Sequence, residues 1–87
     1  MTFRLVYAER AERQLNRLNP QTSLRIVNGC ERLKTHPFPD GKHVKKLKGY
    51  ENIYRLRVGD YRIVFRISKD VVEVIDVVSK PDFKKSY

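Results

Sequence analysis

The side chains of this sequence that could do chemistry are mostly cations, and several gather in one short stretch. Between Tyr54 and Ile67 the chain reads Y-R-L-R-V-G-D-Y-R-I-V-F-R-I. Its four arginines are Arg55, Arg57, Arg62 and Arg66. Arginine stays protonated in proteins, and its planar fork of N–H donors matches the oxygens of a phosphate. A solvated basic face is the plain alternative, but cations held on rigid strands favour a phosphate-binding site.

A β-hairpin would position these arginines. Apolar and basic residues alternate along Tyr54–Val58, which is typical of a strand with one apolar face. Gly59 and Asp60 form a two-residue connection with glycine first, which favours a type II′ turn. The alternation resumes along Tyr61–Ile67. We therefore expect the hairpin to bring the four arginines close together on one side of a sheet.

The overall composition indicates one domain, residues 1–87, with a polyanionic partner. The 19 lysines and arginines outnumber the 10 acidic residues and give a net charge of +9. Such a charge suits nucleic acid, an anionic membrane surface or an acidic protein. No apolar run approaches membrane-spanning length and no signal peptide is evident, so we expect a cytoplasmic protein. Cys30 is the only cysteine and should be an inert core residue, and we expect no metal or other cofactor.

The first half of the chain predicts a strand followed by two helices. Alternating residues indicate a strand over about residues 2–7, and helical spacing follows over residues 8–18. Asn19 and Pro20 should end the first helix and begin the second as N-cap and first residue. Gly29 should weaken the second helix by about 1 kcal/mol relative to alanine. We expect an antiparallel helical hairpin over one face of a sheet. The second helix would supply an apolar face of Leu24, Ile26, Val27, Cys30 and Leu33.

The second half predicts a β-meander. Prolines and a glycine mark Thr35–Lys42 as a loop, and Val44–Lys48 should be a short strand. Val71–Val78 is rich in β-branched residues, which favours an interior strand, and the tail Ser79–Tyr87 need not be regular. We therefore predict an α+β fold with an N-terminal strand, an antiparallel helical hairpin and a three- to four-stranded antiparallel meander. Lysines of the short strand could protect an edge or contact phosphates; they are Lys45, Lys46 and Lys48.

Two motifs in this region resemble a known family. The runs Lys46–Gly49 and Tyr54–Phe65 are similar to the KLKG…YRxRxGDYRxxY core of the RelE/ParE superfamily, toxins of bacterial and archaeal type II toxin–antitoxin systems. The RelE branch, which the basic hairpin and the tail favour, consists of endonucleases that cleave messenger RNA in the ribosomal A site. The resemblance implies a RelE-like fold, metal-independent RNA cleavage, and an antitoxin, the ribosome and mRNA as partners.

The resemblance also implies roles for individual residues. RNA cleavage by its own 2′-hydroxyl needs deprotonation of that hydroxyl, stabilisation of charge on the phosphate and protonation of the 5′-oxygen. Arg55 and Arg57 fall where RelE enzymes have basic residues that activate the hydroxyl and hold the phosphate, although arginine is a poor base. Arg62 matches the expected transition-state stabiliser. Tyr87 matches a C-terminal tyrosine implicated in base stacking or proton transfer.

The tail departs from the family pattern at one position. Pro81 stands where RelE enzymes carry an arginine implicated as the general acid, so a tail lysine would have to replace it. Two alternatives stay open: a ParE-like inhibitor of DNA gyrase, and a catalytically weak member that binds only nucleic acid or its antitoxin. The additional residues expected to bind substrate are Lys45, Lys46, Lys48, Arg66, Lys80, Lys84 and Lys85.

Overall fold

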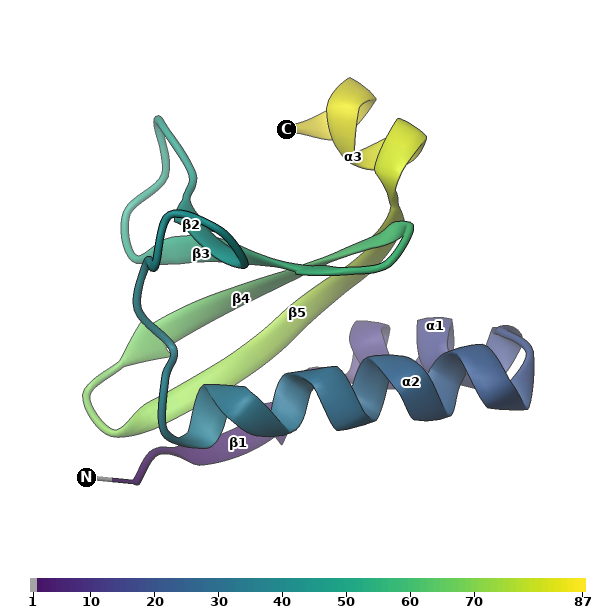
Figure 1. Ribbon diagram of the computed structural model, residues 1–87, viewed down its shortest axis with the longest axis horizontal. Coiled ribbons are helices and arrows are strands. Elements are labelled where there is room, and N and C mark those ends of the chain that lie inside the picture. The colour runs from purple at the N-terminus through teal and green to yellow at the C-terminus, as the bar shows by residue number, and fades with distance from the viewer. Residues whose placement is uncertain (1) are drawn as a thin grey trace.

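A mixed five-stranded sheet forms the centre of the molecule, with helices on both of its sides (Figure 1). The computed structural model describes residues 2–87. Within these residues, no helix combines the length and the apolar character needed to cross a membrane. In chain order the elements are β1 (Arg4–Tyr7), α1 (Glu9–Arg17), α2 (Pro20–Cys30), the 3-10 helix η1 (Glu31–Lys34), β2 (Val44–Lys46), β3 (Ile53–Val58), β4 (Tyr61–Ser68), β5 (Val71–Ser79) and α3 (Lys80–Ser86).

The strand order is β1-β5-β4-β3-β2, and it confirms the α+β class while correcting the sheet. The strands β2 to β5 form the expected antiparallel meander, with β2 at one edge. The N-terminal strand completes the sheet by pairing in parallel with β5, from Arg4 opposite Val71 to Tyr7 opposite Val74. A parallel pair needs a long connection between its strands, and the whole helical hairpin and meander lie between β1 and β5.

The hairpin of β3 and β4 has the predicted tight turn. Val58 pairs with Tyr61, so Gly59 and Asp60 are the two connecting residues. Gly59 has a φ of +56°, whereas Asp60 does not adopt a positive φ. This combination fits a type II′ turn, in which only the first central residue is left-handed. The turn fixes the register of the two arginine-bearing strands.

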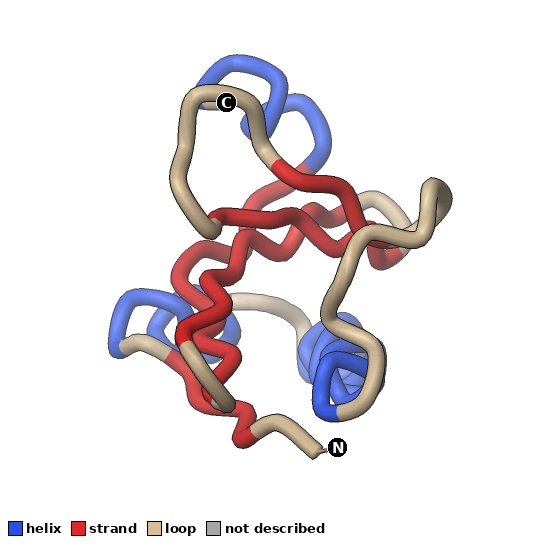
Figure 2. Tube along the Cα trace, turned by 90° about the vertical axis from the view of Figure 1, so that its left-hand side faces the viewer, coloured by secondary structure: helices blue, strands red, loops and turns tan. Residues whose placement is uncertain are grey.

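α2 covers one side of the sheet, with the main core beneath it, and α1 lies beside β5 past the end of β1 (Figures 1 and 2). The predicted capping of α2 is confirmed, because the Asn19 side chain accepts the Gln21 backbone N–H at 2.8 Å. Leu24 does not join the core as expected: it is 62% exposed. Leu24 lies two positions before buried Ile26, which corresponds to about 200° around a helix. Members of the buried cluster include Ala11, Ile26, Cys30, Leu33, Leu56, Ile63, Phe65, Val72 and Val74.

Gly29 has a packing role that the sequence did not reveal. A Cβ atom added at this position would lie 2.9 Å from Cγ2 of Val58 on β3. Real Cβ atoms do not approach a neighbour this closely, so the absence of a side chain lets α2 pack close to the sheet. The helical cost of this glycine is therefore offset by close packing. The neighbouring Cys30 is fully buried, and burial raises the pKa of its thiol to about 11, as an inert core residue requires.

The tail forms a helix, α3, although the sequence analysis did not require regular structure there. Ser79 is its N-cap, and the Ser79 hydroxyl accepts the Asp82 backbone N–H at 3.4 Å. Pro81 lies in the first turn, where proline is well tolerated. α3 lies on the side of the sheet opposite to α2 (Figure 1). Pro81 thus helps to begin the helix that carries Tyr87.

Candidate functional site

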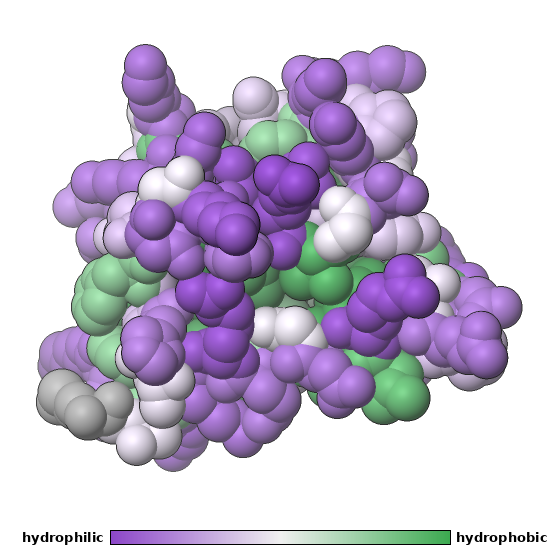
Figure 3. Space-filling model, in the orientation of Figure 1, coloured by the Kyte–Doolittle hydropathy of each residue, from purple (hydrophilic) through white to green (hydrophobic). Residues whose placement is uncertain are grey.

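The side of the sheet away from α2 carries a set of cations that we call the arginine face: Lys45, Arg55, Arg57 and Arg62. Arg57 is directly opposite Arg62 in the register of β3 and β4, and Lys45 on β2 is opposite Arg55. Directly paired residues share one face of a sheet, as do residues two apart on a strand. The loop after β2 and the helix α3 rise on this same side (Figure 1). In Figure 3, mostly hydrophilic residues cover this part of the molecule, above the sheet.

Arg55 is held by a hydrogen bond to the backbone. Its Nη1 donates to the His43 carbonyl oxygen at 3.0 Å, just before β2 begins. Burial lowers the pKa of the Arg55 guanidinium, and the nearby positive charges of Arg62 and Arg57 lower it further. The three guanidiniums therefore repel one another across a short distance. A bound phosphate would relieve this repulsion, because two negative oxygens can accept hydrogen bonds from several guanidiniums at once.

Arg62 and Arg57 differ in how they are held. The Nη1 of Arg62 donates to the carbonyl oxygens of Gly59 and Tyr61, both at 3.1 Å, so its side chain lies back over the turn. Arg57 is exposed, and within residues 2–87 no hydrogen bond or ion pair holds its side chain. Both guanidiniums can reorient toward an anion at small cost, since exposed carbonyl oxygens can bind water instead.

The structure separates two predicted residues from this face. Arg66 lies four residues from Arg62, which is about 13 Å along a strand, and its Nη2 is 3.5 Å from Oε1 of Glu73. The expectation that all four arginines lie close together is therefore corrected for Arg66. Lys46 is opposite Tyr54, whose ring stacks on Phe65 in the core, so Lys46 points to the other side of the sheet.

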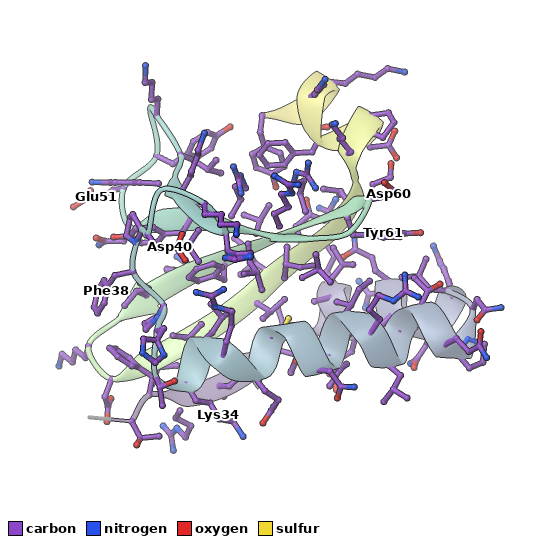
Figure 4. The ribbon with its side chains drawn as sticks, in the orientation of Figure 1. Lys34, Phe38, Asp40, Glu51, Asp60 and Tyr61 are labelled. Carbon is purple, nitrogen blue, oxygen red and sulfur yellow. The ribbon has the colours of Figure 1, made fainter. Side chains whose placement is uncertain are left out.

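The remaining lysines lie around the arginine face and are exposed. Lys48 belongs to the loop after β2, and Lys80, Lys84 and Lys85 are exposed on α3. The backbone N–H of Lys80 donates to the Asp60 carbonyl oxygen at 2.8 Å, which joins the start of α3 to the hairpin turn. Figure 4 shows Asp60 at this turn, below α3.

Tyr87 is brought to the arginine face by α3. Its hydroxyl donates to Oδ2 of Asp76 on β5 at 2.7 Å. Its ring stacks on Phe83, with 5.2 Å between centroids, and meets the ring of Tyr50 at 5.9 Å and an angle of 47°. Burial raises the pKa of the Tyr87 phenol, and the hydrogen bond to Asp76 raises it further. Tyr50 is 44% exposed and Tyr87 is 37% exposed, so part of this aromatic cluster is open to solvent.

Asp76 and Tyr50 are site residues that the sequence analysis missed. By strict alternation Asp76 would share the core side of β5 with Val72 and Val74. The register between β4 and β5 shifts at Ile75, so that Asp76 is opposite Val64 and belongs to the arginine face. The available signal was a second carboxylate besides Glu73 in a largely apolar interior strand, because such a group is buried only with partners.

Comparisons with known proteins point to one family of toxins. The family model described as the ParE toxin of the type II toxin–antitoxin system parDE matches residues 5–80. The candidate toxin RelE1 of Methanocaldococcus jannaschii is 32% identical over 71 residues, which cover 80% of this chain and 79% of that protein. These matches extend over both the helical hairpin and the arginine-bearing strands.

Solved structures agree with this assignment. The archaeal RelE–RelB complex of Pyrococcus horikoshii gives a TM-score of 0.76 at 26% identity, covering 92% of this chain and 97% of that chain. A doubly substituted RelE toxin of E. coli in the free state gives a TM-score of 0.76 at 25% identity, covering 98% and 90% of the two chains. The fold and the expected RelE-like branch are therefore supported by proteins of similar size.

Proposed function

Because the chain belongs to the RelE/ParE superfamily of toxins from type II toxin–antitoxin systems, we propose that it cleaves messenger RNA in the A site of the ribosome. The observation that carries this proposal is the arginine face, with Tyr87 placed beside it. The relative and the solved structures that support the RelE-like branch bear the name RelE. This reaction would take place in the cytoplasm.

In the proposed reaction the RNA's own 2′-oxygen attacks the adjacent phosphorus, and the bond from phosphorus to the 5′-oxygen breaks. Arg57 and Arg62 would bind the non-bridging oxygens, since they are directly opposite each other and can reorient. Arg55 would add a fixed positive charge beneath them, because its Nη1 is already bonded to the His43 carbonyl. Negative charge grows on these oxygens in the transition state. The arginines therefore stabilise the transition state more than they stabilise the bound substrate.

The proposal leaves proton transfer and alignment largely to the complex with the ribosome. Arginines are poor bases at neutral pH, so the arginine face by itself would hold a phosphate without activating the 2′-hydroxyl. Orientation of the reacting groups can contribute about 7–11 kcal/mol, which the ribosome could supply by holding the RNA. The exposed lysines Lys45, Lys48, Lys80, Lys84 and Lys85 would contact further phosphates of the RNA or ribosome.

An antitoxin is the second proposed partner. One of the similar solved structures is a complex of RelE with RelB. The net charge of +9 suits an acidic partner, and a partly disordered segment could fold along the basic surface. We expect expression of the chain alone to arrest growth, and co-expression of the cognate antitoxin to restore it. Normal growth with the chain abundant and without a partner would contradict the assignment as a toxin.

Inhibition of DNA gyrase is the competing function, because the matching family model is described by the name ParE. The two functions predict different lesions after brief induction. Our proposal predicts new RNA ends within A-site codons of translated messages, with intact chromosomal DNA. Gyrase-linked DNA breaks without such RNA ends would contradict our proposal and support the ParE-like function. If neither lesion appears, the chain would be a member of the family that only binds nucleic acid or its antitoxin.

A further inference from the structure

A buried carboxylate lies directly behind the candidate catalytic tyrosine. Asp76 is only 5% exposed, and it is the one buried charged residue among residues 2–87. Its Oδ2 accepts a hydrogen bond from the Tyr87 hydroxyl at 2.7 Å. Its Oδ1 accepts a hydrogen bond from Nε2 of Gln14 at 2.7 Å and lies 3.4 Å from Nε of Arg10. These partners come from α1 and from the C-terminus, so Asp76 joins three parts of the fold.

Contacts other than the one with Tyr87 also hold Asp76 in position. The pairing of β1 with β5 ends at Val74, so the edge of β5 is open beyond that residue. There Gln14 Oε1 accepts the Val77 backbone N–H at 2.7 Å while Gln14 Nε2 donates to Asp76. One amide group therefore holds both the strand edge and the carboxylate. Because an unpaired buried charge is strongly unfavourable, the carboxylate also needs the donors that surround it.

Tyr87, in contrast, depends on contacts outside its own segment. It follows α3, which has seven residues, and helices this short are marginal without tertiary contacts. Within the described residues, the bond to Asp76 is the hydrogen bond that holds the Tyr87 side chain to the sheet. The rings of Phe83 and Tyr50 contact its ring from α3 and from the loop after β2.

We propose that Asp76 is a positioning residue for Tyr87, which holds the tyrosine ring beside the arginine face and keeps the hydroxyl proton bound to a carboxylate. The inference rests on the proposed RNA cleavage and deepens it. It decides between the two roles that the family resemblance left open: Tyr87 acts through its ring, against a base of the RNA, and does not protonate the 5′-oxygen. A phenol that donates to a buried carboxylate, and whose pKa is raised, is a poor acid for a second acceptor.

The first experiment is a double-mutant cycle on cleavage of ribosome-bound RNA in a single turnover. Asp76→Asn keeps the size of the side chain but removes its charge, and Tyr87→Phe keeps the ring but removes the tether. We expect each substitution to lower the rate about tenfold, as for loss of a hydrogen bond to a charged group, and the double variant to be no slower than either. Losses that multiply in the double variant would show that Asp76 acts without Tyr87 and would overturn the proposal.

Tyr87→Phe also tests the proposal if Asp76→Asn fails to fold. Tyr87 is partly exposed at the end of the chain, so its substitution spares the core. We expect this variant to remain folded, to exchange the amide protons of α3 faster and to cleave about tenfold more slowly. A Tyr87→Phe variant with the full cleavage rate would show that the tether is unnecessary and would overturn the proposal.

A second measurement does not depend on RNA cleavage. The charged and titratable groups that face the Tyr87 phenol are Asp76 on β5, Arg10 on α1 and Tyr50 on the loop after β2. The phenol can be titrated by NMR of 13Cζ-labelled tyrosines, with the Tyr87 signal identified by its loss in Tyr87→Phe. We expect Asp76→Asn to lower the Tyr87 pKa, whereas an unchanged titration would overturn the proposal. If the natural chain cleaves no RNA, the proposed function fails, but this titration still tests the tether.

Discussion

Replacing Arg62 with alanine removes a guanidinium that is directly opposite Arg57 on the arginine face. In the free protein this guanidinium makes two hydrogen bonds of 3.1 Å to the carbonyl oxygens of Gly59 and Tyr61 at the turn. These carbonyls can bind water in the variant, and the repulsion with Arg55 is relieved. We therefore expect the free energy of unfolding to change by less than about 1 kcal/mol.

The effect on cleavage should be much larger than the effect on stability. Removing a group that stabilises charge in the transition state typically lowers the rate by about 10²–10³, or about 2.7–4 kcal/mol. Ribosome binding should weaken far less, because other cations share the contacts with phosphates before reaction. Stability, ribosome affinity and single-turnover cleavage should be measured on the same preparation, so that a loss of rate is not confused with a loss of folded protein.

Arg66→Ala is the matched control, since Arg66 is on the same strand and side of the sheet but pairs with Glu73. We expect this variant to cleave within about threefold of the natural chain, because an exposed ion pair contributes about 0–1 kcal/mol. The reasoning would be refuted by an Arg62→Ala variant that folds, binds ribosomes and cleaves at the natural rate. Equal losses in the two variants would also refute it, because they would indicate a general effect of charge.

Three further predictions concern the scaffold. Gly29→Ala should lower the free energy of unfolding in urea by about 1–2 kcal/mol, because the alanine Cβ would overlap Val58. This loss should exceed the gain from alanine's better helix propensity, and a stabilised variant would contradict this packing. The carboxylate of Asp40 accepts three backbone N–H groups, which hold its pKa far below the ordinary value. The contribution of the Asp40 carboxylate to stability is therefore complete above about pH 4 and is lost as the pH falls through the depressed pKa. The difference in unfolding free energy between the natural chain and Asp40→Asn should shrink over that range. A difference that stays constant with pH would contradict this prediction. Ser79→Ala removes the cap of α3, should cost about 1 kcal/mol of helix stability and should speed amide exchange in α3; unchanged exchange there would show that the Asp82 bond is dispensable.

Features set by local sequence could be predicted well. Alternation and the order of Gly59 and Asp60 predicted the β3–β4 hairpin and its turn. Asn19 and Pro20 predicted the start of α2 because capping depends on residues next to one another. The helix α3 had a local signal of the same kind: a serine, a proline and an aspartate occupy the N-cap and first turn of S-K-P-D.

Features set by distant contacts could not be predicted. The parallel pairing of β1 joins residues at opposite ends of the chain, and no periodicity records such a partner. The side on which Asp76 lies depends on a one-residue register shift, which reverses the alternation that a strand pattern assumes. Arg66 follows the same alternation along β4 as Arg62, but its ion pair with Glu73 on β5 and its distance along β4 separate it from the other arginines. The sequence predicted the antiparallel meander, but the site also depends on the register between β4 and β5, which the sequence did not predict.

Cleavage of a defined message on purified ribosomes tests the central claim most directly. Ribosomes are stalled with a known codon in the A site, the purified chain is added, and the new RNA ends are mapped beside the same RNA without ribosomes. The account predicts a cut within the A-site codon on ribosomes and little cleavage of the free RNA, since the arginine face binds phosphate without orienting the 2′-hydroxyl. Rapid cutting of the free RNA at many positions, or no cut on ribosomes with active protein, would contradict it.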